Sequence, residues 1–534
     1  MGSTSTPAER SASSSPTRLE HAANTHAHDG RAMSRRRSSR RRGALSRGHV
    51  LAVVLGALAL GGVLFACGSD DAPPPCEGAA CVDGGGTEGS TPEGGSETST
   101  TDDGGDGGLD GGNASDTGTN CTGPAGTLDP TFGNGGMVVL AYPNETANAK
   151  AVVVQPDGRI VVGGEKTSTA EGFALVRLLA NGTLDTTFGT GGLVETKVGN
   201  TSHVLRALAL QPDGKILAAG YTRFVGQNFD FAVLRYASDG TLDPTFGTAG
   251  IVLTDFTTRT DQAMAMALMA DGRILVAGQT LSDDLTVAEM AFARYNPDGS
   301  LDTTFGSGGR ATVDVRGTPD QARGIVPLPG GKILAAGTSR DPAVSRTDMV
   351  AVRLNADGAL DTTFGNAGFF LTNFGGPGSH TAQAIVIDSA GRPLLGGFYG
   401  TTAPRDFIAI RLTAAGAFDA TFGDGGVATA DFQGRDDNGS ALLVEQGDRY
   451  VLAGSSLPAS PTPEPRMALS RHLPTGALDP TFGTTGRALV PLPIGYSGTP
   501  IAGAALAPCG VVVVGGWNDD ALGLSAIGVA RFRR

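Results

Sequence analysis

Short apolar runs alternate with turn-forming residues along most of the chain beyond residue 126. One stretch shows the pattern well, with apolar runs at Leu193–Lys197, Leu205–Leu210, Ile216–Ala219 and Phe231–Tyr236. Runs of this length that are rich in Val, Ile, Leu and Ala and bounded by Gly, Asn, Asp and Pro are typical of β-strands. The segment QPDGK at 211–215 joins the second run to the third and has the residues of a hairpin turn. The pattern predicts four strands in this stretch.

The same pattern returns seven times, each copy carrying the phrase GxLDxTFG or a close variant of it, with a period of 56–60 residues. A fixed period of this size indicates a propeller or a solenoid. Four strands per repeat predict an all-β fold, a seven-bladed β-propeller with four antiparallel strands per blade. Solenoids normally have atypical terminal repeats, whereas the first and last copies here are intact, which favours a closed ring. The phenylalanines of the phrase, which we expect to pack between blades, are Phe132, Phe188, Phe246, Phe305, Phe364, Phe422 and Phe482.

The folded part is expected to span residues 121–534. Each repeat starts at the link into its first strand, and the chain stops after a fourth strand. We therefore expect the chain ends to meet between the first and last blades, with no blade shared between them, so that another contact must hold the seam. The expected repeats lie near 126–181, 182–239, 240–298, 299–357, 358–415, 416–475 and 476–534.

The seven phrases and their PDGK-type turns resemble the delta-60 repeat family of bacterial exported proteins, whose function is unassigned. The resemblance covers residues 126–534. It implies a β-propeller and an exported location, and it brings no catalytic residue with it.

The first 66 residues have the character of a targeting segment. Residues 50–66 are apolar and uncharged, and seven arginines precede them between Arg35 and Arg47. A basic region before an apolar one is the pattern of a secretory signal. Residues 1–32 do not fit a signal, and Met33 would give a signal of ordinary length, so Met33 is a candidate initiator.

The apolar segment ends in Leu64-Phe65-Ala66-Cys67, which resembles the lipobox of bacterial lipoproteins. The resemblance implies that Cys67 receives the lipid and becomes the mature N-terminus, so that the protein is anchored to a membrane of the cell envelope. Gly68 stands where an Asp retains lipoproteins of enteric bacteria in the inner membrane, which indicates the outer membrane by analogy. The alternative is an uncleaved signal anchor with an incidental cysteine.

The segment that follows has the composition of a tether. Residues 68–120 contain 12 Asp and Glu and no Lys or Arg, with many Gly, Ser and Thr. Such a segment cannot bury an apolar core, so residues 67–120 are predicted to be a disordered linker that carries the lipidated cysteine. Cys76 and Cys81 lie within it and are expected to form a local disulfide in an oxidising compartment.

The remaining two cysteines are Cys121 and Cys509. Cys121 precedes the first phrase, and Cys509 takes the place of the Asp in the PDG turn of the last repeat. In the expected ring, these positions share one face of neighbouring blades, which predicts a disulfide that joins the ends of the ring. The alternative is two free thiols.

Two charged positions recur in all seven repeats. The first interpretation is a ring of carboxylates for a metal, and the second is structural pairing of each Asp with an Arg or with a turn. A feature present in every blade favours the structural interpretation. The Asp series is Asp129, Asp185, Asp243, Asp302, Asp361, Asp419 and Asp479, and the Arg series is Arg177, Arg235, Arg294, Arg353, Arg411, Arg471 and Arg531.

Enzyme signatures are absent from the sequence. His203, His380 and His472 fall in three different repeats, and we interpret them as surface residues rather than zinc ligands. There is no Gly-x-Ser-x-Gly, no His-Glu-x-x-His, no phosphate loop and no EF-hand spacing. We therefore assign no catalytic residue, no cofactor and no metal. The formal charge of −13 argues against a nucleic-acid partner.

Loop variation carries the functional hypothesis. The links from the first to the second strand and from the third to the fourth differ between repeats, whereas the PDG turns recur. Because the two kinds of link leave a propeller on one face, we expect a monomeric binding or display module whose varied face takes a protein or glycan. Drift of unconstrained loops would give the same pattern. The alternatives are purely structural packing of the envelope, or a lactonase-like or quinone-dehydrogenase-like enzyme with a site at the central channel.

Overall fold

The computed structural model describes the folded part of the chain. The targeting segment, the linker, Met33, Cys67, Cys76, Cys81 and Cys121 lie outside the described residues. Among the described residues, no helix is long and apolar enough to span a membrane. The described residues are 122–142, 144–167, 172–199, 202–225, 227–256, 259–282, 287–343, 346–372, 374, 378–400, 404–458 and 464–534.

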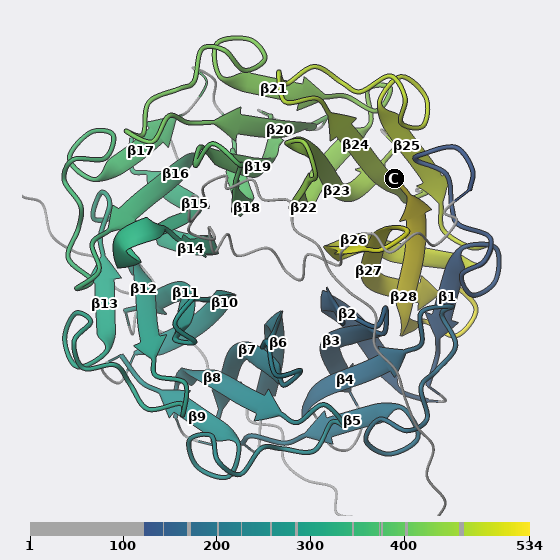
Figure 1. Cartoon of the computed structure of the whole chain (residues 1–534), viewed down its shortest axis with the longest axis horizontal. Coiled ribbons are helices and arrows are strands. Elements are labelled where there is room, and N and C mark those ends of the chain that lie inside the picture. Colours follow the sequence, from purple (N-terminus) through teal and green to yellow (C-terminus); the bar gives the residue numbers. More distant parts are fainter. Residues whose placement is uncertain are drawn as a thin grey trace, which may run out of the picture. The chain divides into compact units, whose positions relative to one another are not determined.

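Seven four-stranded antiparallel sheets stand around a common centre as the blades of a propeller, as the sequence predicted (Figure 1). Within each blade the strands are called A to D from the centre outward, and blades are numbered along the chain. The first to third blades are β2 (Thr146–Val154), β3 (Ile160–Thr167), β4 (Gly172–Leu178) and β5 (Leu193–Thr196); β6 (Ser202–Leu210), β7 (Ile216–Arg223), β8 (Phe229–Tyr236) and β9 (Ile251–Thr254); and β10 (Thr260–Leu268), β11 (Ile274–Leu281), β12 (Ala288–Tyr295) and β13 (Arg310–Val313).

The remaining blades follow the same order, and one helical turn, η1 (Pro329–Gly331), lies between β14 and β15. The fourth to seventh blades are β14 (Asp320–Pro327), β15 (Ile333–Asp341), β16 (Arg346–Leu354) and β17 (Phe369–Thr372); β18 (Thr381–Ile387), β19 (Pro393–Tyr399), β20 (Asp406–Arg411) and β21 (Val427–Ala430); β22 (Asp436–Glu445), β23 (Arg449–Leu457), β24 (Arg466–His472) and β25 (Arg487–Pro491); and β26 (Tyr496–Ala507), β27 (Gly510–Asp519) and β28 (Leu524–Arg533) with β1 (Met137–Leu140).

The expectation that no blade is shared between the chain ends is wrong. Strand β1 pairs antiparallel with β28, from Met137 opposite Ala530 to Leu140 opposite Ile527, and so completes the seventh blade. In every repeat the first strand is strand D of the preceding blade, as β5 is for β4. The phrase GxLDxTFG folds into a compact connection that returns the chain onto strand C, where Asp185 N donates to Arg177 O at 2.9 Å. The short link after strand D then leads into the next blade.

The hydrophobic core is distributed between blades rather than gathered at one centre. One cluster unites Phe173, Leu175 and Phe188 of the first blade with Leu205 and Ile216 of the second. Six similar clusters follow around the ring. The phenylalanine of every GxLDxTFG phrase is fully buried, so this residue packs between blades as expected.

Antiparallel pairing gives the ring two different faces. The face that carries the A-to-B turns and the C-to-D connections is called the repeat face, and the face that carries the B-to-C and D-to-A connections is called the loop face. On the loop face, the B-to-C connections range from four to eight residues. On the repeat face, five of the C-to-D connections have the same length of fourteen residues, namely 179–192, 237–250, 296–309, 355–368 and 473–486.

Candidate functional site

The structure brings the repeated Asp and Arg together in all seven blades. In each, the Arg Nε donates to Oδ2 of the Asp at 2.7 to 2.9 Å. The Asp lies in the C-to-D connection and the Arg near the end of strand C. In the seventh blade the pair joins Arg531 to Asp129, which are 402 residues apart in the sequence. The pair is therefore part of ring closure at that blade.

The third blade shows the full set of contacts. Arg294 Nη2 donates to Thr304 Oγ1 at 3.0 Å, and its guanidinium stands over the ring of Phe305 at 4.7 Å. The other oxygen of Asp302 accepts from the backbone N of Thr304 at 3.1 Å and from its Oγ1 at 2.6 Å. Each conserved letter of the D-x-T-F string thus binds or packs against the same arginine.

The phrase also joins each blade to the next. Arg294 Nη1 donates to the carbonyl of Ala356 in the fourth blade. The backbone N of Gly306 donates to Asp357 O at 2.7 Å. Gly306 has a φ of +54°, and a Cβ there would lie 2.0 Å from the carbonyl oxygen of Arg310, so only glycine fits.

A further basic residue completes the network, and the sequence interpretation missed it. Arg273, at the end of the A-to-B turn, approaches Asp302 Oδ2 at 2.9 Å, and Lys332 approaches Asp361 Oδ2 at 2.7 Å. The seventh blade has Arg533 at 3.8 Å from Asp129. The Lys or Arg that follows the PDG turn was the available signal, because it recurs with the turn.

These carboxylates are charged and fully engaged. Burial raises the pKa of Asp302, but hydrogen bonds from Thr304 and Arg273 and the charge of Arg294 outweigh burial and hold the pKa well below its usual range. The same balance lowers the pKa of Asp361, where the hydrogen bond from Lys332 is the largest cause. A carboxylate that accepts this many hydrogen bonds has no oxygen left for a metal, so the arrangement is that of a structural series.

The three histidines do not lie on the surface, which corrects their interpretation. His203, His380 and His472 are all buried. His203 Nδ1 lies 2.6 Å from Thr222 Oγ1, and the His472 ring stacks on Tyr450 at 4.8 Å. Burial lowers the pKa of His472 to about 4, so its ring is neutral at pH 7. Each histidine belongs to a different blade, and none takes part in an acidic or histidine-containing cluster among the described residues.

Ring closure brings the surroundings of the two predicted disulfide partners to one strand. Cys509 lies in the turn between β26 and β27, and its neighbour Gly510 pairs with Arg533 of β28. The backbone N of Gly126 donates to Arg533 O at 2.7 Å. Cys121 lies outside the described residues, so its pairing with Cys509 stays a prediction. Both chain segments belong to the seventh blade, rather than to two neighbouring blades as expected.

Two clusters of carboxylates lie on the loop face and were not predicted. One carboxylate oxygen from each of Asp230, Asp255 and Asp261 lies within 4.8 Å of the others. The same holds for a second set at the equivalent positions three blades further round the ring. A weak sequence signal existed, since both links read Asp-Phe-x-x-x-x-Asp, but the third carboxylate comes from a different strand. The second set is Asp406, Asp431 and Asp437.

The centre of the ring carries basic and amide side chains from strands A. Strand A of every blade has a register shift, and the shifted residues include Arg206 and Arg323. Arg323 donates to Gln321 Oε1 at 2.6 Å and to Gln383 Oε1 at 3.2 Å. Burial and the positive charge of the Arg206 guanidinium lower the pKa of Arg323. Arg206 Nη2 donates to the hydroxyl of Tyr221 at 3.2 Å.

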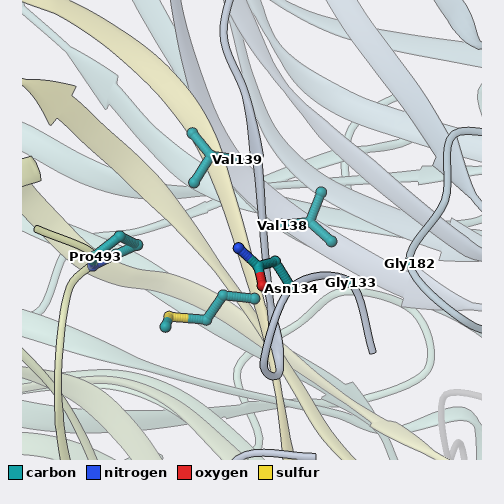
Figure 2. A pocket seen from close by; sticks show the side chains of 7 residues that line it. Gly133, Asn134, Val138, Val139, Gly182 and Pro493 are labelled. Atoms are coloured by element: carbon teal, nitrogen blue, oxygen red, sulfur yellow. The ribbon is translucent and has the colours of Figure 1, made fainter. Parts of the chain in front are cut away.

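A hollow at the outer edge of the seventh blade is lined mainly by backbone and apolar side chains (Figure 2). Asn134 lies between Pro493 on the left and Val138 of β1 on the right, with Val139 above them (Figure 2). No titratable side chain is among its lining residues, so these offer no acid or base.

Four segments of the chain match the family described as "Domain of unknown function (DUF5122) beta-propeller", namely residues 155–188, 211–246, 270–305 and 328–364. Each match runs from an A-to-B turn to the phenylalanine of the next GxLDxTFG phrase. The matches support a repeat-type β-propeller family. No curated protein matches the chain.

Three solved structures with which the chain shares similarity are propellers or lyases by their descriptions. Virginiamycin B lyase from Staphylococcus aureus is 9% identical, with 74% of this chain and 99% of that chain covered and a TM-score of 0.39. Polysaccharide lyase Uly1 is 13% identical, with coverages of 76% and 92% and a TM-score of 0.40. The β-propeller domain of the Trilobed protease from Pyrococcus furiosus is 10% identical, with coverages of 73% and 94% and a TM-score of 0.37. Similarity at this level carries no argument about activity.

Proposed function

We propose that this chain is a lipid-anchored protein of the bacterial cell envelope, with the outer membrane as the expected location. Its propeller acts as a non-enzymatic binding module that takes a protein or glycan on the loop face. The lipidation site is Cys67, and residues 68–120 serve as the tether. Its repeats resemble the delta-60 family, which fits an exported propeller.

The observation that carries the proposal is the placement of the most exposed apolar side chains. Val225 is 70% exposed, Leu522 is 68% exposed, and Ile494 is fully exposed. Val225 and Leu522 lie in B-to-C connections and Ile494 in a D-to-A link, so all three belong to the loop face. Exposed apolar side chains rimmed by polar residues are typical of recognition surfaces.

The links that carry two of these side chains lie side by side. The backbone N of Asp520 donates to Gly495 O at 2.9 Å, which holds the Leu522 loop against the Ile494 link. The large apolar side chains exposed on the repeat face are less exposed, with Leu184 at 40% and Phe418 at 37%. Ile494 and Leu522 are therefore the residues with which the proposal is tested.

The test uses the full chain carrying Cys67→Ser, which receives no lipid. This protein is probed with a glycan array and with an extract of outer-membrane proteins, with and without Ile494→Glu and Leu522→Glu. We expect a saturable ligand whose affinity falls at least tenfold in the double variant. Leu253→Glu, on the outer strand β9, is the matched control and should bind as the parent does. A ligand that binds the double variant unchanged, or turnover of a glycan, contradicts the proposal.

The anchor is tested separately in the producing cell. Metabolic labelling with palmitate should mark the parent protein, and Cys67→Ser should abolish the label and release the protein from the membrane fraction. Unchanged labelling of the variant contradicts the lipid anchor and leaves the binding face untouched.

A further inference from the structure

The two carboxylate clusters occupy equivalent junctions between blades. At the second junction, Asp230 lies in β8 and Asp255 follows β9, both in the second blade, while Asp261 lies in β10 of the third blade. At the fifth junction, Asp406, Asp431 and Asp437 hold the corresponding positions of the fifth and sixth blades. Each cluster therefore joins strands C and D of one blade to strand A of the next.

One carboxylate in each cluster is completely buried and only half satisfied. Asp261 has an exposed fraction of 0%, its Oδ2 accepts from the backbone N of Phe256 at 2.7 Å, and its Oδ1 has no hydrogen-bond partner. Asp437 has the same exposure, accepts from the backbone N of Phe432 at 2.9 Å, and also leaves its Oδ1 without a partner. A buried anionic oxygen without a partner is costly, so the site calls for a cation or a proton.

Arginines beside the two clusters hydrogen-bond to other groups. Arg310 donates to the backbone oxygen of Asp255 at 2.5 Å. The guanidinium of Arg405 is engaged with Asp436, the residue before Asp437, at 2.6 and 2.7 Å.

Neighbouring junctions balance the same acidic position with arginine. Glu289 takes the place of Asp230 at the third junction, and Arg259 lies 3.4 Å from it. Asp348 takes that place at the fourth junction, and Arg316 lies 2.8 Å from it. An arginine therefore pairs with this acidic side chain at the third and fourth junctions. At the second and fifth junctions, three carboxylates converge instead.

We propose that the second and fifth junctions each bind one calcium ion through these three carboxylates. Carboxylate oxygens alone are the donor set of hard cations such as calcium and magnesium. Calcium bonds oxygen at about 2.3–2.6 Å, so its ligand atoms stand up to about 5 Å apart, which includes the 4.8 Å limit of both clusters. Magnesium, at about 2.0–2.1 Å, draws opposite ligands to about 4 Å and fits less of that range.

A bound ion would join neighbouring blades on the loop face, as the repeated arginines do on the repeat face. It would join two consecutive blades at a point where the loops vary, and it would hold the start of strand A against the preceding blade. The proposal does not depend on the lipid anchor or on the ligand of the loop face.

The test measures calcium binding by the full chain after dialysis against EDTA. Calorimetric titration with CaCl₂ should show two sites per chain, and millimolar calcium should raise the melting temperature by a few degrees, on the order expected for ligand-linked stabilisation. Asp261→Asn and Asp437→Asn should each remove one site, and the double variant should remove both. Because the acidic linker is intact in every variant, the double variant also measures any binding by residues 68–120.

Asp320→Asn is the matched control. Asp320 occupies the same position of strand A in the fourth blade, is equally buried, and also has an Oδ1 without a partner, but it belongs to no carboxylate cluster among the described residues. This variant should keep both calcium sites. If a buried variant fails to fold, Asp255→Asn and Asp431→Asn replace it at the exposed member of each cluster.

Three outcomes overturn the proposal. The first is a parent protein that binds no calcium at millimolar concentration. The second is an Asp261→Asn and Asp437→Asn double variant that keeps two sites. The third is a preference for magnesium, with MgCl₂ displacing calcium at equal concentration, which would assign the clusters to a different ion.

Discussion

Arg294 shows how one side chain serves two blades. Its Nε binds Asp302, its guanidinium covers Phe305, and its Nη1 reaches the carbonyl of Ala356 in the next blade. Because the arginine is 1% exposed, removing it would leave the Asp302 carboxylate in a dry site with only Arg273 nearby. The repeated phrase is thus a set of contacts centred on one guanidinium.

Arg294→Ala should lower the free energy of unfolding by about 3–5 kcal/mol, because breaking a buried ion pair leaves a buried charge uncompensated. The measurement is denaturant unfolding of the full chain. Arg259→Ala, in a link of the loop face, is the control, since its pair with Glu289 is partly exposed and is worth less than about 1 kcal/mol. Equal effects of the two substitutions would contradict the structural role of the phrase.

Asp320 makes a pH-dependent contribution to the free energy of unfolding, and a single substitution can isolate it. Burial and the charge of Asp314 raise its pKa to about 6, against the hydrogen bond from the backbone N of Val315 and the charge of Arg316. An unfolded Asp titrates near 3.9, so between about pH 4 and pH 6 the folded state binds more protons. The free energy of unfolding therefore falls as pH rises through this window.

Asp320→Asn should remove this loss. Relative to the parent, the variant should gain stability at pH 8, by roughly 3 kcal/mol at most, and the difference should shrink toward pH 4. Thermal unfolding in EDTA across pH 4–8 measures it without a contribution from calcium. A stability difference that is constant with pH would mean that Asp320 does not titrate in this window.

The sequence predicted the positions of some residues correctly and of others wrongly, and each outcome has a physical reason. The phenylalanines were placed between blades because an apolar residue repeated in every blade must be buried. The basic residue after each PDG turn was missed because its contact, Arg273 with Asp302, spans two hairpins. The histidines were placed on the surface because a single polar letter does not show that Tyr450 covers the ring of His472.

Among the strands, β1 closes the ring. Its four residues pair with β28, and Met137 and Val139 pack into the core between the sixth and seventh blades. The sequence could not reveal this pairing, because a period of fixed length can be cut into blades at any strand. The structure shows that the cut falls between the first and second strands of each repeat.

A chain that begins at residue 141 should lose the closure. Strand β28 would then present an unpaired edge, which is a template for pairing with another chain. Size-exclusion chromatography should show oligomers or aggregates, and the melting temperature should fall. A chain that begins at residue 121 keeps β1 and serves as the control. A monomer of unchanged stability from the shorter chain would contradict closure by β1.

Cys121 and Cys509 should form a disulfide that ties the start of the folded part to the seventh blade. Gly126 and Gly510 both bond or pair with Arg533, so the two chain segments flank one residue. Peptide mapping of the non-reduced protein should recover the two cysteines in one linked peptide. Cys509→Ser should lower the melting temperature, since the cross-link constrains the unfolded chain. Two alkylatable thiols in the parent protein would contradict the pairing.

The two faces of the whole molecule have different roles. The repeat face holds buried ion pairs and bonds between blades, such as Gly306 N with Asp357 O at 2.7 Å, in which a substitution disturbs two blades. The loop face carries connections of different lengths and the exposed Ile494 and Leu522. The fold could be predicted from the period of the repeats and from the four strands in each of them. The carboxylate clusters could not, because they arise only when strand C of one blade meets strand A of the next.

The division between the two faces can be measured in one stability scan. The full chain is displayed on cells with single substitutions throughout residues 122–534 and is challenged with protease, so that survival reports folding. Substitution of the repeated Asp, Arg or Phe should cost about 3 kcal/mol or more in every blade, whereas loop-face positions such as Ile494 and Leu522 should stay within about 0.5 kcal/mol of the parent. A scan in which the repeated Asp and Arg tolerate substitution, while loop-face positions do not, would contradict the account.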